Sequence, residues 1–231
     1  MRFTLLALIL ALLCSCRSHQ AAAPAQPAWY ENEILAFQQA DAAHPPAAGQ
    51  VLCIGSSSIR MWSTLAEDLA PAPVLNRGFG GSKTAELLAV FDRIVTPYNP
   101  DVIVYYCGDN DLGTDNTDSQ AAADGFIDFD NRARSLWPDI DVFYIAIKPS
   151  IARWNNWPAM AKANGLVREY CRSTPGAHFL DIASPMLTAQ GPDPALFVSD
   201  GLHLNEKGYQ VWTSVVREPV LEAWHRHATR P

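Results

Sequence analysis

A serine-rich turn and a distant aspartate–histidine segment are the features of this sequence best suited to covalent chemistry. The apolar run at residues 51–54 ends in Gly55-Ser56-Ser57-Ser58, and Asp200-Gly201-Leu202-His203 lies near the C-terminus. Sheets of the α/β type place reacting groups where strands end, and a carboxylate three residues before an imidazole can orient that imidazole as a base. Together the two segments predict a hydrolase with a serine nucleophile.

Each segment alone also fits an ordinary structural role, because serines cap helices and Asp-x-x-His occurs in surface turns. Two further segments favour chemistry: Asn76-Arg77-Gly78-Phe79-Gly80-Gly81 after the short run 74–76, and Gly108-Asp109-Asn110-Asp111 after the run 102–106. Glycine backbone and an asparagine side chain can donate N–H groups to an oxyanion. The first segment could instead bind phosphate, but Lys83 stands where a dinucleotide fingerprint needs its third glycine. The second could be a simple Asx turn.

The ordered set of these four segments resembles the sequence blocks of the SGNH hydrolases, also called the GDSL esterase/lipase family. The stretch at residues 76–81 is most similar to the branch that includes platelet-activating-factor acetylhydrolase catalytic subunits and bacterial lysophospholipase-like esterases. The resemblance covers roughly residues 48–222. It implies a three-layer, flavodoxin-like fold with a central parallel five-stranded sheet, and it implies ester hydrolysis without a cofactor.

The resemblance also implies a role for individual residues. Ser57 becomes the nucleophile, His203 the general base and Asp200 its orienting partner. The backbone N–H groups of Ser57 and Gly81 and the side chain of Asn110 become the oxyanion donors. The family usually has aspartate before the nucleophile, whereas Ser56 stands here. Three adjacent hydroxyls therefore leave Ser56 and Ser58 as alternatives to Ser57. A Gly-x-Ser-x-Gly nucleophile elbow would require glycine at the position of Ile59.

Composition and charge argue against some classes of function. The 231 residues are 48% hydrophobic, enough for one sizeable core. The net charge of −7 argues against a nucleic-acid partner, which would require a basic patch. Isolated histidines such as His225 and His227 lack the spacing of a zinc site, so no metal is expected.

The N-terminus has the pattern of an export signal. Residues 1–16 combine a short apolar run with Leu13-Cys14-Ser15-Cys16, which resembles a bacterial lipobox with Cys16 as the first mature residue. Residues 17–28 then form an Ala/Pro-rich tether, and residues 29–231 form the hydrolase domain. The alternative is an ordinary secretory cleavage near residues 21–25. We expect an exported lipoprotein that is anchored to the membrane through Cys16.

Three cysteines remain after the leader: Cys53, Cys107 and Cys171. The first two lie in predicted core strands, where burial is the usual reason for cysteine. An odd number of cysteines does not indicate a disulfide framework. A bridge between Cys53 and Cys107 remains open, because the sequence does not give its geometry.

Strand and helix patterns alternate along the chain, which predicts a parallel sheet covered by helices on both faces. The predicted strands are residues 51–54, 74–76, 102–106, 142–147 and 178–181. The predicted helices are residues 61–69, 84–94, 120–136, 159–171 and 206–225. The catalytic segments then fall at one edge of the sheet.

The loop at residues 148–158 follows the fourth predicted strand at that same edge. Its Trp154, Trp157 and Arg153 could line an acyl or alcohol pocket, or could serve packing and a structural ion pair. The expected substrate is a small-molecule or glycan ester with a short acyl group. Alternatives are a lysophospholipase, a thioesterase, a glycan O-acyltransferase and a non-catalytic carbohydrate-binding relative.

Overall fold

The central sheet is parallel and has five strands. The computed structural model describes residues 28–113 and 118–229. The strands, in the order β2-β1-β3-β4-β5, are β1 (Val51–Gly55), β2 (Val74–Gly78), β3 (Val102–Tyr106), β4 (Asp141–Ile145) and β5 (Ala177–Leu180). All four neighbouring pairs are parallel. The predicted five-stranded parallel sheet is confirmed, and each predicted strand overlaps an observed one.

The strands alternate their side chains between two apolar clusters. In β1, Leu52 and Ile54 pack into one cluster, whereas Val51 and Cys53 pack into the other. All five residues of β1 are buried, as are all five of β3 and of β4. Strands that are buried on both faces explain why the sequence shows continuous apolar runs in place of strict alternation.

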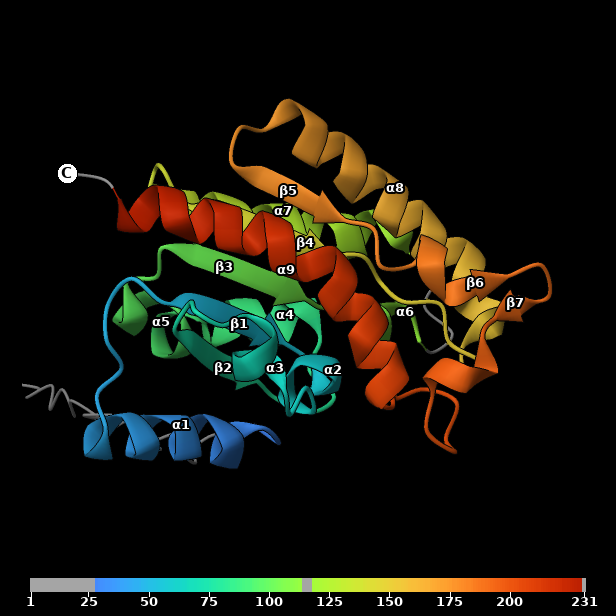
Figure 1. The fold of residues 1–231 in the computed structure, drawn as a ribbon, viewed down its shortest axis with the longest axis horizontal. Coiled ribbons are helices and arrows are strands. Elements are labelled where there is room, and N and C mark those ends of the chain that lie inside the picture. The colour runs from blue at the N-terminus through green and yellow to red at the C-terminus, as the bar shows by residue number, and fades with distance from the viewer. Residues whose placement is uncertain (1–27, 114–117, 230–231) are drawn as a thin grey trace, which may run out of the picture.

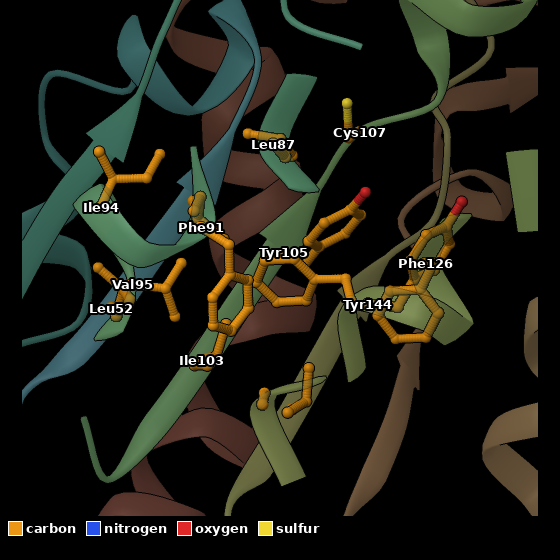
Figure 2. Packing of buried hydrophobic residues seen from close by; sticks show 14 of the residues in the cluster. Leu52, Leu87, Phe91, Ile94, Val95, Ile103, Tyr105, Cys107, Phe126 and Tyr144 are labelled. Atoms are coloured by element: carbon orange, nitrogen blue, oxygen red, sulfur yellow. The ribbon is translucent and has the colours of Figure 1, made fainter. Parts of the chain in front are cut away.

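The first cluster lies under five helices: α1 (Glu31–Ala43), α4 (Thr84–Ala89), α5 (Phe91–Ile94), α7 (Ser119–Leu136) and α8 (Trp157–Ser173). Figure 2 shows its aromatic centre around Tyr105, Phe126 and Tyr144. The ring centroids of Phe126 and Tyr144 are 4.7 Å apart, at an angle of 58°. Tilted rings at this distance are a favourable arrangement for aromatic pairs.

The second cluster lies under α2 (Ser57–Arg60), α3 (Leu65–Asp68) and α9 (Glu206–Ala228). Figure 1 shows α9 lying across this face, with α4, α5 and α7 behind the sheet. Trp212 of α9 is fully buried against Tyr106 of β3, with ring centroids 4.8 Å apart. Helices therefore cover both faces, and the predicted three-layer α/β fold is confirmed.

The remaining elements are short. They are α6 (Asp109–Leu112), the hairpin strands β6 (Leu187–Thr188) and β7 (Gly191–Pro192), and four 3₁₀ helices: η1 (Thr96–Tyr98), η2 (Trp154–Asn156), η3 (Ser184–Met186) and η4 (Pro194–Leu196). Within the described part of the chain, no helix combines the length and apolarity that a membrane span requires.

Two predicted helices differ from the structure, and one observed helix of more than three turns was missed. The predicted helix at residues 61–69 is wrong over most of its length, because only Leu65–Asp68 is helical. The Asp68 carboxylate accepts hydrogen bonds from Trp62 Nε1 at 2.6 Å and Thr64 Oγ1 at 2.7 Å, and these bonds accompany a turn. The predicted helix at residues 84–94 divides at Val90 into α4 and α5. Helix α1 was not predicted.

The three cysteines of the described residues are not bridged. Cys53, Cys107 and Cys171 are all free. Cys53 belongs to the cluster under α9, whereas Cys107 belongs to the cluster on the opposite face, so the two thiols point to different sides of the sheet. Burial raises the pKa of the Cys53 thiol, which suits a packing role. The expected signal peptide, Cys16 and nearly all of the tether lie outside the described residues.

Candidate active site

The turn after β1 is shaped by a glycine. Gly55 has a φ of +150°, and a Cβ at this position would lie 1.9 Å from the carbonyl oxygen of Tyr106 in β3. Only glycine allows this close approach of two backbones. The Ser56 N–H donates to the same carbonyl at 3.1 Å. The strand therefore ends sharply, and Ser57 becomes the first residue of α2.

Ser57, His203 and Asp200 form a continuous hydrogen-bonded chain. Ser57 Oγ lies 3.0 Å from His203 Nε2, and His203 Nδ1 lies 2.6 Å from Asp200 Oδ2. The other carboxylate oxygen of Asp200 accepts the backbone N–H groups of Leu202 at 2.8 Å and His203 at 2.9 Å. The two segments that the sequence analysis paired therefore meet at one edge of the sheet. This arrangement can remove a proton from a serine hydroxyl.

The Asp200 carboxylate is held in its charged form. The hydrogen bond with the His203 side chain, followed by those from the His203 and Leu202 backbone, lowers the pKa of Asp200 to about 2. A carboxylate that stays ionised fixes the imidazole tautomer whose Nε2 faces Ser57 as an acceptor.

The three adjacent serines have different surroundings. Ser56 and Ser58 are buried, with 2% and 1% of their surface exposed. The Ser58 hydroxyl lies 3.3 Å from Lys148 Nζ, and its backbone carbonyl accepts the hydroxyl of Tyr209. His203 contacts Ser57, which is the partly exposed serine of the three. The geometry therefore favours Ser57 as the hydroxyl that reacts.

The glycine-rich loop after β2 reaches the same edge. The Phe79 N–H donates to the Gly55 carbonyl at 2.9 Å, which ties this loop to the end of β1. Gly81 has a φ of +74°, in the left-handed region that glycine favours. Among the residues that the structure describes, the N–H groups of Ser57 and Gly81 have no hydrogen-bond acceptor, so both can donate to a ligand.

Asn110 is oriented by two neighbours. Its Nδ2 donates to the carbonyl of Ser82 at 3.0 Å, and its Oδ1 accepts from Arg153 Nη2 at 3.0 Å. Because Oδ1 accepts a hydrogen bond from Arg153, the other end of the amide must be the NH₂ group. One hydrogen of this group bonds Ser82, and the second remains available to a ligand. Asn110 can therefore serve as an oxyanion donor together with the Ser57 and Gly81 amides.

A buried ion cluster lies beneath Asn110. Asp109 forms ion pairs with both Lys148 and Arg153, and it accepts a hydrogen bond from the hydroxyl of Tyr106 at 3.0 Å. Burial alone would raise the pKa of Asp109, but the two cations lower it to about 2. Lys148 is only 1% exposed and also contacts Ser58. The cluster connects the ends of β1 and β3 with the loop after β4.

Only part of this cluster was predicted from the sequence. Arg153 was expected to be either a pocket residue or a structural ion pair, and the structure shows the ion pair together with the bond to Asn110. No role was predicted for Lys148. The available signal was a lysine directly after the buried run that ends at Ile147, because a charge at such a position needs a buried partner.

The tryptophans of the loop at residues 148–158 stack on each other. The ring centroids of Trp154 and Trp157 are 6.1 Å apart, at an angle of 14°. Trp154 is 38% exposed. The Ala152 N–H donates to the carbonyl of Gly201 at 3.0 Å, so this loop borders the segment that carries Asp200 and His203. Within residues 28–113 and 118–229, no group of three ligating side chains could hold a metal ion.

Comparisons with known proteins identify the family and the fold. Residues 47–211 match the profile of the GDSL-like lipase/acylhydrolase family. A Bacteroides fragilis structure described as an acylhydrolase has a TM-score of 0.74 and 20% identity, and the match covers 86% of this chain and 100% of that one. A Streptococcus pneumonia structure described as a platelet activating factor has a TM-score of 0.73 and 18% identity, with 82% and 92% covered.

A third similar structure is a family 3 carbohydrate esterase from Talaromyces cellulolyticus. It has a TM-score of 0.61 and 16% identity, and the match covers 77% of this chain and 98% of that one. At these identities the likeness extends to the fold. A search of curated proteins gave no match.

Proposed function

We propose that this chain, which belongs to the GDSL-like lipase/acylhydrolase family, is a serine esterase that cleaves short-chain carboxylic esters through an acyl-enzyme. One observation carries the proposal: Ser57 Oγ lies 3.0 Å from His203 Nε2, while His203 Nδ1 lies 2.6 Å from Asp200. A hydroxyl, a base and a carboxylate in this order form the arrangement that activates serine for acyl transfer.

In the proposed first step, Ser57 Oγ attacks the ester carbonyl carbon as His203 Nε2 takes the hydroxyl proton. The carbonyl oxygen becomes an oxyanion, and the N–H groups of Ser57, Gly81 and Asn110 stabilise it. The imidazolium then gives its proton to the departing alkoxide, and the alcohol leaves. Asp200 stabilises the imidazolium throughout.

In the second step, water attacks the acyl-enzyme carbonyl. His203 takes a proton from this water and returns it to Ser57 Oγ as the acid leaves. The same oxyanion donors act again, because the second tetrahedral intermediate carries the same charge. The chemistry requires no cofactor.

Short acyl groups are the favoured substrates. The sequence after the expected signal contains no long apolar lid and no amphipathic segment that would indicate an interfacial lipase. Several similar folds are described as esterases of acetyl or carbohydrate substrates. The exposed Trp154 offers a flat face to a sugar or aryl ring of the alcohol.

A panel of aryl esters on the mature domain tests this proposal. We expect higher kcat/KM for acyl groups of two to four carbons than for those of eight or more, and loss of activity in Ser57→Ala. A reversed order, or efficient release of fatty acid from lysophospholipid, would favour a lysophospholipase. Acyl transfer to an added sugar would favour a glycan O-acyltransferase, and complete inactivity of the wild type would favour a non-catalytic carbohydrate-binding relative.

We further propose that the protein is exported and anchored through an acylated Cys16, with its domain facing the periplasm or cell surface. The lipobox-like sequence before Cys16 supports this proposal. Replacing Cys16 with serine should release the protein from the membrane fraction or block its processing. Wild-type protein that is already free in the periplasm or medium would contradict the anchor.

A further inference from the structure

An exposed arginine lies one helical turn beyond the proposed nucleophile. Arg60 is the last residue of α2, and Ser57 is the first. Residues three apart in a helix lie on the same face. Arg60 is exposed to solvent, and its side chain begins one turn from the proposed nucleophile.

The Arg60 guanidinium packs on the loop that carries the proposed oxyanion donor. A Cβ at Gly80 would lie 2.9 Å from Arg60 Nη2 and 3.1 Å from both Cζ and Nε. Because three guanidinium atoms are almost equally distant, the planar group lies over Gly80, next to Gly81. Any other side chain at position 80 would displace it.

Within the described residues, Arg60 differs from the other arginines in having neither a carboxylate nor a carbonyl partner for its guanidinium. Every other arginine that the structure describes donates to a carboxylate or a backbone carbonyl. Arg226, for example, pairs with Asp141, and Arg217 bonds the carbonyls of Asp68 and Ala70. A chain with a net charge of −7 has many carboxylates. The unpaired guanidinium is therefore available to an anion from outside the chain.

A carboxylate also contacts this loop. Glu33 of α1 accepts the Gly80 N–H at 3.2 Å. No ion pair joins this carboxylate to Arg60 within the described residues. The Glu33 contact holds the loop from the α1 side.

A tryptophan from the N-terminal segment packs on the same loop, beside Gly81. Trp29 is 59% exposed, and its ring reaches within 3.4 Å of the position that a Gly81 Cβ would occupy. Its Nε1 donates to Glu86 at 2.8 Å, and its ring packs edge-on against Tyr30. The indole is thus held in place with much of its surface open to solvent.

We propose that Arg60 and Trp29 form a binding site for the non-reacting part of the ester, and that this part is a sugar ring that carries an anionic group. A guanidinium binds carboxylate or phosphate through two parallel hydrogen bonds, and the indole provides a flat surface for the ring. The proposal rests on the proposed esterase function and names its substrate class.

Three acetyl esters separate the contribution of the anionic group from that of the sugar ring. They are acetylated glucuronic acid, acetylated glucose, and acetylglycerol phosphate, which is anionic but has no ring. Wild type should show a higher kcat/KM for the acetylated glucuronic acid than for the acetylated glucose. Arg60→Gln should lower the ratio of these two values about tenfold, since charged hydrogen bonds are lost. The control Arg172→Gln, at an exposed arginine of α8 that pairs with Glu169, should keep the ratio.

Trp29→Ala should lower kcat/KM more for the two sugar esters than for acetylglycerol phosphate. Equal values for charged and neutral esters in wild type, or equal losses on both in Arg60→Gln, would overturn the proposal.

Failure of this proposal can be distinguished from failure of the esterase function. If the wild type cleaves aryl acetates but none of the three esters, the esterase function stands and this substrate class is overturned. If it cleaves neither the aryl acetates nor the three esters, the esterase function is contradicted. Calorimetric binding of glucuronate and of glucose then tests the site separately. Binding of glucuronate that Arg60→Gln weakens would support it, and equal or absent binding of both sugars would overturn it.

Discussion

At the residue scale, the central result is that one serine hydroxyl of three faces a histidine. The resemblance of the four ordered segments to the SGNH hydrolases implied Ser57, Gly81, Asn110, Asp200 and His203 as one site. It left the register among the serines open, because adjacent hydroxyls have the same chemistry. Only the burial of Ser56 and Ser58 and the 3.0 Å contact of Ser57 with His203 separate them.

Asn110 should act mainly in the transition state. Replacing Asn110 with alanine should lower kcat by about 10²–10³ with little change in KM, because the oxyanion that it stabilises is absent from the bound substrate. Steady-state kinetics on an aryl acetate measure this. A change in KM alone would instead make Asn110 a substrate-binding residue.

Arg153 should act through Asn110. Arg153→Lys keeps a positive charge near Asp109 but lacks the guanidinium fork that also reaches Asn110 Oδ1. We expect kcat to fall about tenfold while KM stays within about twofold, as an order-of-magnitude effect of a misplaced donor. In an Asn110→Ala background, the same substitution should have almost no further effect on kcat. Additive losses in kcat would contradict this positioning role, and Arg168→Lys serves as an exposed control.

At the scale of elements, the long periodic segments were predictable and the short ones were not. Residues 120–136 and 159–171 were predicted as helices and lie within α7 and α8, because each presents one apolar face over many turns. Residues 61–64 share that apolar spacing, but they form a turn in which the side chains of Trp62 and Thr64 donate hydrogen bonds to the Asp68 carboxylate. Local side-chain bonds of this kind override periodicity.

The packing of α1 shows another limit of the sequence. Helix α1 contributes only one buried side chain, Ile34, so its apolar periodicity is weak. Its position depends on distant contacts, such as Arg93 with Glu31 at 2.8 Å and Gly80 with Glu33. Figure 1 shows this helix beyond β2, at the edge of the molecule. Contacts between segments this far apart in sequence are not visible in local patterns.

Lys148 should stabilise the junction of β1, β3 and the loop after β4. Lys148→Met leaves Asp109 charged and buried with one cation fewer, so the free energy of unfolding should fall by about 3 kcal/mol. Urea unfolding monitored by fluorescence measures the change. The matched control is Lys162→Met at an exposed position of α8, expected within about 0.5 kcal/mol of wild type. An equally small change for Lys148→Met would mean that the buried pair adds nothing to stability.

At the scale of the whole molecule, a second ion cluster lies at the start of β4, at the opposite end of that strand from the proposed active site. The Asp141 carboxylate lies 2.6 Å from Nε2 of His178 in β5 and 2.9 Å from Nε2 of His227 in α9. It also forms an ion pair with Nη2 of Arg226 at 3.2 Å. Burial would raise the pKa of Asp141, but these partners lower it to about 2. These contacts hold the C-terminal end of α9 against the sheet.

The lowered pKa of Asp141 predicts a specific acid dependence. The folded state holds this proton less tightly than the unfolded chain, so the stabilisation is present above about pH 4 and is lost as the pH falls toward 2. Asp141→Asn should therefore be less stable than wild type at pH 7 and should lose stability less steeply between pH 4 and 2. Equilibrium unfolding across that range compares the two slopes, and equal slopes would contradict the linkage.

The central claim is that Ser57 is the nucleophile of a serine esterase, and covalent labelling tests it most directly. The mature domain is treated with a fluorophosphonate, digested and mapped by mass spectrometry, in parallel with the Ser57→Ala variant. The account predicts one adduct on Ser57, loss of aryl-ester hydrolysis in proportion to labelling, and no adduct in Ser57→Ala. An adduct on Ser56 or Ser58, or full hydrolytic activity in the unlabelled Ser57→Ala variant, would contradict it.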